Sequence, residues 1–537
     1  MARQHIIFVG AGISALIAAL ERLEKGDTVT IVERRSRADY GGQCNWAFGG
    51  FFFADSPDQR RFRIKDSHEL AWEDWQSYAE FDEADPFVDR YKYWAKRYIE
   101  RAVPDVYEWM TSRNMRFVPT PNWAERAGGG KGNRVPRFHL LWGCGPELSR
   151  NIIASLDGFE NNGLTLLFDT EVTGLIRTGG KITGVRTRRE GTDSELTADL
   201  VVLASGGFTG DLSQVRERWP HEWNRPPAGE ALLTGVWPEM DGSMHRAAEE
   251  VGAKLTNMSN MWVYVAGVSN WRSTVKGQGA ALIPMKSALW MGADGARFDP
   301  VLLAGYDTRD AVTRVAAQEY PWSWAILNTK ILKRELTIQG SDFNKPFREK
   351  DLLGVAKFLA TGADELLDEF LEKCPDVVVA DTVPELARKM NALVEAADPT
   401  YPKNLVDADV LAKDIATYDA DVAKGSRLFT DDQLVSLRSV RAFLGDKMRT
   451  AGFWPIQQKG HKFVAVRQRL TVRKSLGGLL TDERCQVLDS AGQPIDGLFA
   501  LGEATGFGGG GMNGKRTLEG TLLGGCVFTA REFARQL

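Results

Sequence analysis

Residues 5–33 read HIIFVGAGISALIAALERLEKGDTVTIVE, and this stretch decides the fold. An apolar run of β-type residues, 5–9, meets a glycine-rich turn, and apolar residues then recur at helical spacing as far as Leu23. A second apolar run, 28–32, stops at the acid Glu33. The order of strand, glycine turn, helix, strand and acid predicts a βαβ unit at the start of an α/β domain.

The glycine turn has the chemistry of a dinucleotide site. Gly10 permits the tight turn out of the strand, and Gly12 lets a pyrophosphate approach the backbone because it has no Cβ. Ala15 still allows close packing of the helix, whose N-terminus at Ser14 offers free N–H groups to phosphates. Glu33 follows Gly12 by 21 residues, where a carboxylate accepts hydrogen bonds from ribose hydroxyls. An ordinary βα turn would not require this acid.

Length, composition and charge narrow the class of protein. The chain has 537 residues, of which 43% are hydrophobic, so it is long enough for two or more domains. A net charge of −4 does not indicate nucleic acid or anionic lipid as a partner. The five cysteines form no C-x-x-C pair and the six histidines no H-x-x-x-H pair, so we expect neither a disulfide framework nor a metal site.

The chain also lacks the usual signals for export or membrane insertion. The first predicted strand begins near residue 5, which leaves no room for a signal peptide. No run of about 18 apolar residues is present, so no membrane-spanning helix is expected. Together with the unpaired cysteines, these features lead us to expect a cytoplasmic protein in a reducing compartment.

Two segments after Glu33 suit the same ligand. The basic run 34–37 is either a solvated loop or supplies a guanidinium to the adenine or a phosphate, with Arg34 favoured because it adjoins Glu33. Residues 40–50, YGGQCNWAFGG, contain two glycine pairs. Glycine lets backbone run flush against a flat ligand. Because this segment follows the second strand, we expect it beside the ring end of the bound dinucleotide.

These motifs resemble a known superfamily. The G-x-G-x-x-A start, the acid after the second strand and the G-G-Q-x-x-x-A-x-G-G segment are similar to flavoprotein subunits of fumarate reductase and succinate dehydrogenase. They equally resemble 3-ketosteroid dehydrogenases, and the chain as a whole resembles FAD-binding dehydrogenases of the ketosteroid dehydrogenase-like branch. The resemblance implies an α/β fold: a Rossmann-like FAD-binding domain of the GR2 type (1–255 and 460–537) with an inserted α+β cap (256–459) that holds the substrate.

The resemblance implies FAD held without a covalent bond. Covalent members of the superfamily attach the flavin to a histidine in the second segment, and here no histidine lies between His5 and His68. Cys44 is either a thioether link or, as a small hydrophobe, part of the core. In addition to Gly10, Gly12, Ser14, Ala15, Glu33 and Arg34, the implied FAD contacts are Gly41, Gly42, Gln43, Gly49, Gly50, Val172, Ser205, Gly206, Gly207, Gly502, Glu503 and Gly520.

A segment of the cap region is the first candidate for proton chemistry. Residues 292–298, GADGARF, and 306–310, YDTRD, resemble a fumarate reductase pattern in which the arginine of T-R-D delivers a proton to substrate carbon. That arginine is Arg309 here, and Tyr306 and Tyr264 are the alternatives. Because a guanidinium stays protonated, a proton relay through a nearby carboxylate would be required. The other interpretation is a structural role, in which Arg309 forms ion pairs with carboxylates at the N-terminus of a helix.

Residues near the C-terminus are implied to contact substrate and flavin. Lys474 stands where fumarate reductases place a substrate-binding histidine, and Arg516 falls near the family arginine that holds a carbonyl or carboxylate. Phe507 occupies the glycine loop in which the steroid dehydrogenases carry a tyrosine. The helix that begins at Gly520 is expected to point its N-terminus at the flavin pyrimidine edge.

The implied function is hydride transfer between flavin and a carbon α or β to a carbonyl, which introduces or reduces a C=C bond. The partner is then a small enone or other carbonyl compound, with loose membrane association expected only for a lipophilic substrate. A fumarate reductase-like enzyme for small unsaturated carboxylates and a non-catalytic FAD-binding protein are the two alternatives. Substrate identity, direction, electron partner and oligomeric state are left open by the sequence.

Overall fold

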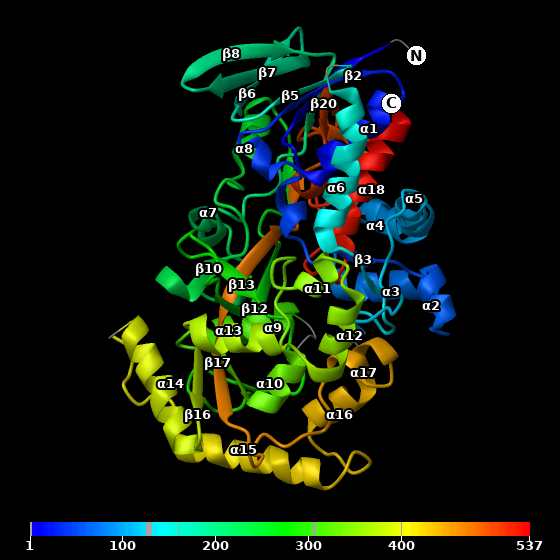
Figure 1. Cartoon of the computed structure of the whole chain (residues 1–537). Helices are drawn as coiled ribbons and strands as arrows, with labels where there is room; N and C mark the ends of the chain where they lie inside the picture. The colour runs from blue at the N-terminus through cyan, green and yellow to red at the C-terminus, as the bar shows by residue number, and fades with distance from the viewer. Residues whose placement is uncertain (1–2, 125–130, 161, 304–307, 399) are drawn as a thin grey trace.

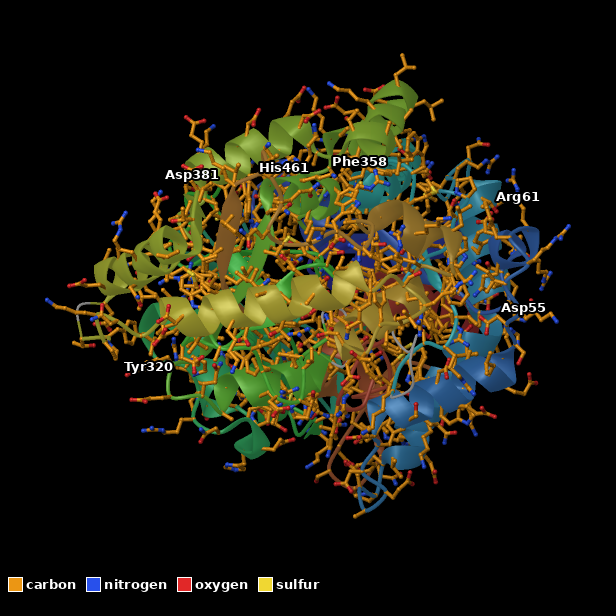
Figure 2. All side chains as sticks on the ribbon, turned by 90° about the horizontal axis from the view of Figure 1, so that it is seen from below. Asp55, Arg61, Tyr320, Phe358, Asp381 and His461 are labelled. Atoms are coloured by element: carbon orange, nitrogen blue, oxygen red, sulfur yellow. The ribbon has the colours of Figure 1, made fainter. Side chains whose placement is uncertain are left out.

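A computed structural model describes residues 3–124, 131–160, 162–303, 308–398 and 400–537 (Figure 1). The two ends of the chain lie close together at the top of Figure 1, and the segment coloured yellow lies at the opposite end. Figure 2 views the molecule from that lower end, with Asp55 and Tyr320 at opposite margins. No helix of the described residues is long and apolar enough to cross a membrane.

The first sheet has six strands in the order β19-β20-β9-β1-β2-β5. All neighbours pair in parallel except β19, which is antiparallel to β20. Its central strands read as continuous apolar runs because both faces of a parallel sheet are covered. The strands are β1 (His5–Val9), β2 (Thr28–Val32), β5 (Leu164–Leu167), β9 (Leu200–Leu203), β19 (Gln486–Leu488) and β20 (Pro494–Ala500).

Helices α1 (Ile13–Glu24) and α18 (Thr521–Gln536) pack against each other beside this sheet. The ring of Phe8 meets that of Phe533 edge-on, with centroids 6.0 Å apart. The predicted sequence of strand, glycine turn, helix and strand is present, and the chain ends on a helix packed beside its first one. An antiparallel sheet of β6 (Glu171–Thr178), β7 (Lys181–Arg189) and β8 (Thr192–Thr197) lies at the top of Figure 1.

The second sheet is built around β17 (Phe463–Ser475), the long orange strand of Figure 1. β17 pairs with four strands, from residues 232–234, 261–269, 322–328 and 377–380, and runs toward the first sheet. The other strands are β10 (Leu232–Thr234), β12 (Met261–Ser269), β13 (Gly279–Ala281), β14 (Leu289–Met291), β15 (Trp322–Asn328) and β16 (Val377–Ala380).

Helices α9, α10, α13 and α14 pack against strands of the second sheet, and two further strand pairs are short. The pairs are β3 (Gly50–Phe52) with β4 (Phe138–Leu140) and β11 (Leu255–Thr256) with β18 (Gly478–Leu479). The remaining helices are α2 (Pro57–Arg61), α3 (His68–Ala79), α4 (Val88–Ala102), α5 (Glu108–Ser112), α6 (Cys144–Leu156), α7 (Leu212–Glu217), α8 (Ser243–Glu250), α9 (Thr308–Ala316), α10 (Thr329–Glu335), α11 (Lys345–Arg348), α12 (Leu352–Thr361), α13 (Asp364–Lys373), α14 (Val383–Ala397), α15 (Ala408–Ala423), α16 (Asp432–Val440) and α17 (Leu444–Arg449).

Candidate functional site

A cavity of about 310 Å³ brings the glycine turn of the first sheet together with β12, β13 and β17 of the second. Most of the predicted cofactor residues line it, although they come from separate parts of the sequence. The predicted residues on its wall are Gly10, Gly12, Ser14, Glu33, Arg34, Gly42, Gln43, Gly49, Gly50, Ser205, Gly206, Lys474, Glu503 and Gly520.

Other predicted residues lie behind this wall or away from it. Gly502 and Gly207 pack behind it: a Cβ at Gly502 would lie 2.4 Å from Ser14 Oγ, and one at Gly207 would lie 2.5 Å from Glu503 Oε1. Tyr306 lies outside the described residues. The predicted residues that are described but are not on the wall are Ala15, Gly41, Val172, Gly207, Gly502, Arg309 and Arg516.

Close backbone approach explains the glycines of the turn. Gly10 has a φ of +98°, and a Cβ there would lie 2.8 Å from the carbonyl oxygen of Ala204. Gly42 has a φ of +61°, and its Cβ would lie 3.2 Å from Gly12 Cα. Gly12 and Gly41 also form a parallel β-bridge. Side chains at Gly10 or Gly42 would strain the backbone and push these segments apart, so both positions require glycine.

Glu33 is held in place at the end of β2. Its Oε2 accepts a 2.8 Å hydrogen bond from the N–H of Ala11, and its Oε1 accepts one of 2.8 Å from the N–H of Arg35. A carboxylate oxygen can accept more than one hydrogen bond, so each oxygen keeps capacity for a ligand hydroxyl. The carboxylate is therefore oriented on the cavity wall as a ribose-binding group requires.

The basic run after Glu33 lines the cavity through two of its arginines. Arg34 Nη1 lies 3.2 Å from Asp241 Oδ2, and Arg35 Nη1 lies 2.7 Å from Glu239 Oε1. The guanidinium of Arg35 also lies over the ring of Trp237, 4.2 Å from its centroid. Both arginine side chains are thus held by protein partners, whereas the side chains of a solvated loop would be free. The ion pair with Asp241 also limits the freedom of Arg34 to contact a phosphate.

Several side-chain donors on the cavity wall are available to a ligand. The side-chain nitrogens Gln43 Nε2, Trp237 Nε1 and Trp262 Nε1 are buried and lack a hydrogen-bond partner among the described residues. Helices α1 and α18 have Gly12 and Gly520 as their N-cap residues, so neither has a side-chain cap, and neither has an acid in its first turn. Buried donors and open helix N-termini favour a ligand rich in acceptors and negative charge. The residues present fit FAD.

Cys44 behaves as a buried hydrophobe with a weak donor. Its side chain lies on the cavity wall but is 4% exposed, and Sγ donates to the carbonyl oxygen of Gly145 at 3.3 Å. Burial raises the pKa of this thiol far above its ordinary value. The thiolate that a thioether link would require is therefore disfavoured.

The predicted substrate cation Lys474 pairs with a predicted cofactor residue. Lys474 Nζ lies 3.0 Å from Glu503 Oε2, and the N–H of Ser475 donates to Glu503 Oε1 at 3.1 Å. The carboxylate is almost fully buried. This pair joins the end of β17 to the glycine loop after β20 at the edge of the cavity.

Arg309 and Arg516 come near each other, but not on the cavity wall. Arg309 pairs with Glu222, donates to the carbonyl oxygen of Lys515 at 3.4 Å, and lies near the ring of Trp223. Arg516 Nη1 lies 2.6 Å from a carboxylate oxygen of Glu80. The structure therefore places both predicted arginines around the loop before α18, each in an ion pair.

A tyrosine–carboxylate pair stands on the wall instead, formed by Tyr264, which the sequence offers as an alternative to Arg309, and Glu519, which the sequence did not indicate. The Tyr264 hydroxyl, on β12, donates a 3.0 Å hydrogen bond to Glu519 Oε1. Burial raises the pKa of Glu519 to about 7, against the opposing effects of Tyr264 and the Arg473 guanidinium. Burial also raises the pKa of Tyr264 and lowers that of Arg473. The available signal was the position of Glu519, directly before the helix-opening Gly520.

Aromatic side chains form a further part of the wall. They come from the second glycine segment, from β4, from β12 and from loops around the second sheet. Their rings make this part of the cavity suited to a flat apolar ligand. These aromatic residues are Trp46, Phe48, Trp123, Phe138, Trp262 and Phe343.

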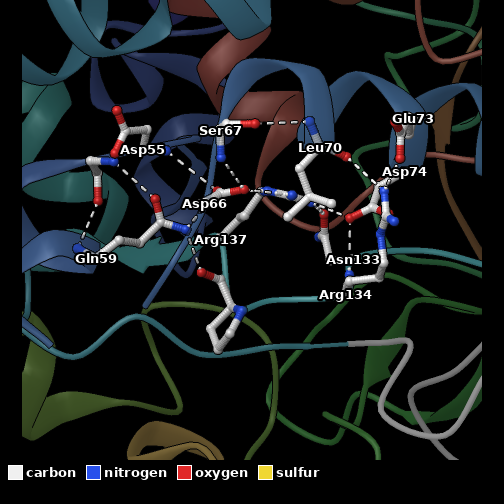
Figure 3. A network of polar contacts seen from close by, with 12 residues as sticks. Asp55, Gln59, Asp66, Ser67, Leu70, Glu73, Asp74, Asn133, Arg134 and Arg137 are labelled. Carbon is white, nitrogen blue, oxygen red and sulfur yellow. Dashed lines mark hydrogen bonds and ion pairs between the residues drawn. The ribbon is translucent and has the colours of Figure 1, made fainter. Parts of the chain in front are cut away.

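A buried charge network fixes the strand that carries Phe138 (Figure 3). The fully buried guanidinium of Arg137 lies 2.7 Å from Asp66 Oδ1 and 2.7 Å from Asp74 Oδ2. Arg134 adds a 2.6 Å contact to Asp74. Because each of these charges has a partner, residues 134–137, which lead into β4, are anchored to α3 and to the residues before it.

Comparison with known proteins agrees with this geometry. A family model described as "FAD binding domain" matches residues 5–523. A KsdD-like steroid dehydrogenase of Mycolicibacterium smegmatis is 35% identical over 97% of this chain and 96% of its own length. One from Mycobacterium tuberculosis is 34% identical, covering 98% of this chain and 94% of that protein.

Solved structures share the fold at lower identity. The 3-ketosteroid delta1-dehydrogenase from Sterolibacterium denitrificans has a TM-score of 0.70 at 18% identity, covering 100% of this chain and 99% of its own. An open flavocytochrome c3 fumarate reductase has a TM-score of 0.65 at 19% identity, covering 99% of this chain and 77% of its own.

Proposed function

Because this chain belongs to the FAD binding domain family, we propose that it oxidises or reduces a CH–CH bond next to the carbonyl group of a bulky, steroid-like substrate. It is an FAD-dependent oxidoreductase, and its likeness to fumarate reductases is secondary, since one such relative is only 23% identical. When bound, FAD supplies the hydride acceptor or donor for this chemistry.

We propose that the cofactor is held without a covalent bond. Gly10, Gly12 and the N-terminus of α1 suit the pyrophosphate, and Glu33 suits the ribose. Residues 42–50 and the open N-terminus of α18 suit the ring end. The buried, protonated thiol of Cys44 supports the non-covalent mode.

We propose that the first sheet, with α1 and α18, is a Rossmann-like FAD-binding domain and the second sheet a substrate cap. The sequence-based division was 1–255, 256–459 and 460–537. Since β17 pairs with β12 and β15, we place its residues, 463–475, in the cap. Under this division the cavity lies where the two domains meet.

The inferred class of substrate rests on a single observation. The glycine turn, the aromatic side chains and the Tyr264–Glu519 pair all line the same cavity. The aromatic rings favour a flat apolar molecule, and the polar pair suits chemistry beside its carbonyl group. The relatives named as steroid dehydrogenases, which match nearly the whole chain, support the same class of substrate.

Charge on the cavity wall disfavours a small dicarboxylate. The four basic residues Arg34, Arg35, Arg473 and Lys474 are matched by four acidic residues, Glu33, Asp342, Glu503 and Glu519. Lys474, Arg34 and Arg35 are also held in ion pairs. A dianion would therefore meet no net positive charge on the wall. The binding of a neutral carbonyl compound does not depend on such a charge, so the balanced wall does not weaken it.

We propose positioning roles for the two arginines predicted as substrate contacts. Arg309 and Arg516 are buried and tie Glu222 and Glu80 to the loop before α18. That loop ends at Glu519 on the cavity wall, so both arginines influence its placement. The role expected for Tyr306 stays a prediction because this residue lies outside the described part of the chain.

The test is anaerobic flavin bleaching. Oxidised holoprotein is mixed with 3-ketosteroids, small enones, and saturated and unsaturated dicarboxylates, and dithionite-reduced protein is mixed with the same panel. We expect a saturated 3-ketosteroid to bleach the oxidised flavin, or its dehydrogenated counterpart to reoxidise the reduced flavin. Response to dicarboxylates alone, or to none of these compounds, would overturn the proposal. The electron partner is then sought among quinones and other acceptors that restore the yellow colour.

A further inference from the structure

Tyr264 and Glu519 meet on the cavity wall although they belong to opposite halves of the molecule. Tyr264 lies on β12 of the second sheet, and Glu519 directly precedes Gly520, where α18 begins. The hydroxyl donates to Glu519 Oε1 at 3.0 Å, and Tyr264 is 8% exposed. A half-buried carboxylate that accepts a hydrogen bond from a phenol on the wall of this cavity is a candidate for proton chemistry.

We propose that Tyr264 and Glu519 form the proton relay of the reaction, with Tyr264 facing the substrate carbon next to the carbonyl and Glu519 as the terminal proton acceptor. This inference rests on the proposed function and adds the groups that remove or return the proton. It also assigns the task to a pair that includes neither Arg309 nor Tyr306.

The proton balance of the step is complete in the dehydrogenation direction. The proton on the carbon beside the carbonyl passes to Tyr264 Oη as the phenolic proton passes to Glu519 Oε1. The electron pair of that C–H bond becomes the new C=C bond, and bound FAD, the oxidant of the proposed function, would take the hydride from the neighbouring carbon. Tyr264 is neutral before and after, and Glu519 changes from carboxylate to carboxylic acid.

The environment of Glu519 suits a group that both takes and releases a proton. Burial raises its pKa to about 7, while Tyr264 on β12 and Arg473 on β17, the titratable and charged groups facing it, act in the opposite direction. A base with a pKa near the working pH gives efficient proton transfer. Burial keeps the pKa of Tyr264 above its ordinary value, so a resting phenolate is disfavoured and the proton must move on to Glu519.

Other titratable groups on the wall are less suited to this task. Lys474 is held by Glu503, and the Arg473 guanidinium stays protonated. Arg473 instead lies where its positive charge favours the ionised form of Glu519. It therefore supports the relay as a positioning residue.

The experiment separates proton removal from hydride transfer. Dithionite-reduced holoenzyme cannot accept a hydride, so it is incubated in D2O with the ketone that bleaches the oxidised wild-type flavin. Deuterium uptake at the carbon beside the carbonyl is then followed by mass spectrometry. Tyr264→Phe and Glu519→Gln are compared with the wild type, each with its FAD content and ketone affinity measured.

We expect both variants to lose roughly 10²- to 10⁴-fold in exchange rate while they keep FAD and bind the ketone. The wild-type rate should rise with pH around an apparent pKa of about 7, because the carboxylate is the active form, and Glu519→Gln should lack this rise. Glu519→Asp should recover part of the rate. Tyr107→Phe is the matched control, since Tyr107 donates a 3.1 Å hydrogen bond to Asp58 away from the cavity wall.

Exchange at near wild-type rates in Glu519→Gln or Tyr264→Phe would overturn the relay. A wild-type enzyme that responds to no carbonyl compound would instead overturn the proposed function, so the two failures are distinguishable. Loss of exchange in Tyr107→Phe to the same extent would also contradict the relay, because it would show a general effect of removing a tyrosine hydroxyl.

Discussion

Lys474 Nζ lies 3.0 Å from Glu503 Oε2, and this ion pair links the last residues of β17 to the glycine loop after β20. The two residues were predicted for different ligands, Lys474 for the substrate and Glu503 for the cofactor. Their contact shows that the second sheet is anchored to the first at the edge of the cavity. Glu503 also accepts from the N–H of Ser475, so the carboxylate is held from two sides.

Lys474→Met should weaken both the fold and FAD binding. It leaves the buried Glu503 carboxylate without its cation, a change that costs about 3 kcal/mol in comparable buried pairs. We expect that loss in urea unfolding and a lower FAD occupancy. Adding Glu503→Gln should recover much of the stability. Lys462→Met, which breaks the exposed pair with Asp381, is the control and should cost much less.

FAD should leave the protein on denaturation. Cys44 Sγ is buried and donates to the carbonyl oxygen of Gly145, and no histidine lies between His5 and His68 to form a covalent link. Acid precipitation should therefore give a yellow supernatant and a colourless pellet. Flavin that stays with the pellet would show a covalent bond, and Cys44→Ala would then identify or exclude its site.

Glu33→Gln should lower FAD affinity with little effect on the fold. The carboxylate accepts from the N–H groups of Ala11 and Arg35, and an amide can accept on only one of its two atoms. Hydrogen bonds to charged groups contribute about 1.5–3 kcal/mol, so we expect FAD to bind roughly 10- to 100-fold more weakly. Glu195→Gln, an exposed change on β8, is the control. Equal FAD affinity in both variants would remove Glu33 from the cofactor site.

The sequence was sufficient to predict those parts of the fold whose residues lie in one continuous stretch. The unit from β1 to Glu33 is continuous, so its strand, turn, helix and acid are readable from residues 5–33 alone. The second sheet was not readable in this way. β17 pairs with residues 232–234, 261–269 and 322–328, and nothing in 463–475 alone specifies those partners.

The same distinction applies to the cavity. The glycines on its wall belong to recognisable sequence motifs. Tyr264 and Glu519 are 255 residues apart and belong to none of these motifs. The raised pKa of Glu519 comes from burial, which depends on packing between distant segments. Arg309 and Arg516 were selected by resemblance, and the structure places both in ion pairs and neither among the residues that line the cavity.

Stability should fall in acid because His139 is buried in its neutral form. Its Nδ1–H donates to the carbonyl oxygen of Arg137, its Nε2 accepts from the Ser56 hydroxyl, and burial lowers its pKa to about 4. The unfolded chain, with an ordinary histidine pKa of about 6.5, binds the proton first. The stabilisation is therefore present above pH 6.5 and is lost as the pH falls through 4, by about 3 kcal/mol.

Urea unfolding between pH 7 and pH 4 measures this loss. His139→Gln should have a lower free energy of unfolding than the wild type at pH 7. Its free energy of unfolding should also fall less steeply as the pH is lowered, because one of the groups that must take up a proton is absent. His245, whose pKa is also lowered to about 4 by burial, should sustain the remaining slope. His461→Gln, a change on the surface, is the control. An unchanged slope in His139→Gln would contradict the assignment.

Arg309→Lys decides between the two proton paths. In fumarate reductases, which this segment resembles, the matching arginine delivers the proton, and removing such a donor would lower kcat by about 10²- to 10⁴-fold at nearly unchanged KM. The structure instead pairs Arg309 with Glu222 and the carbonyl oxygen of Lys515, and Arg309 does not line the cavity. A lysine retains the charge there but loses the second hydrogen bond.

With Tyr264 and Glu519 as the relay, we therefore expect Arg309→Lys to lower kcat less than about tenfold and to reduce the melting temperature modestly. Tyr264→Phe should show the opposite pattern, a large loss in kcat with the melting temperature nearly kept. Both are measured by steady-state turnover with the ketone that bleaches the wild-type flavin. Reduction by dithionite, which needs neither residue, confirms that each variant holds a competent flavin. The relay would be contradicted if Arg309→Lys lowered kcat a hundredfold at constant KM while Tyr264→Phe kept a kcat near that of the wild type. Arg309 would then be the residue that delivers the proton.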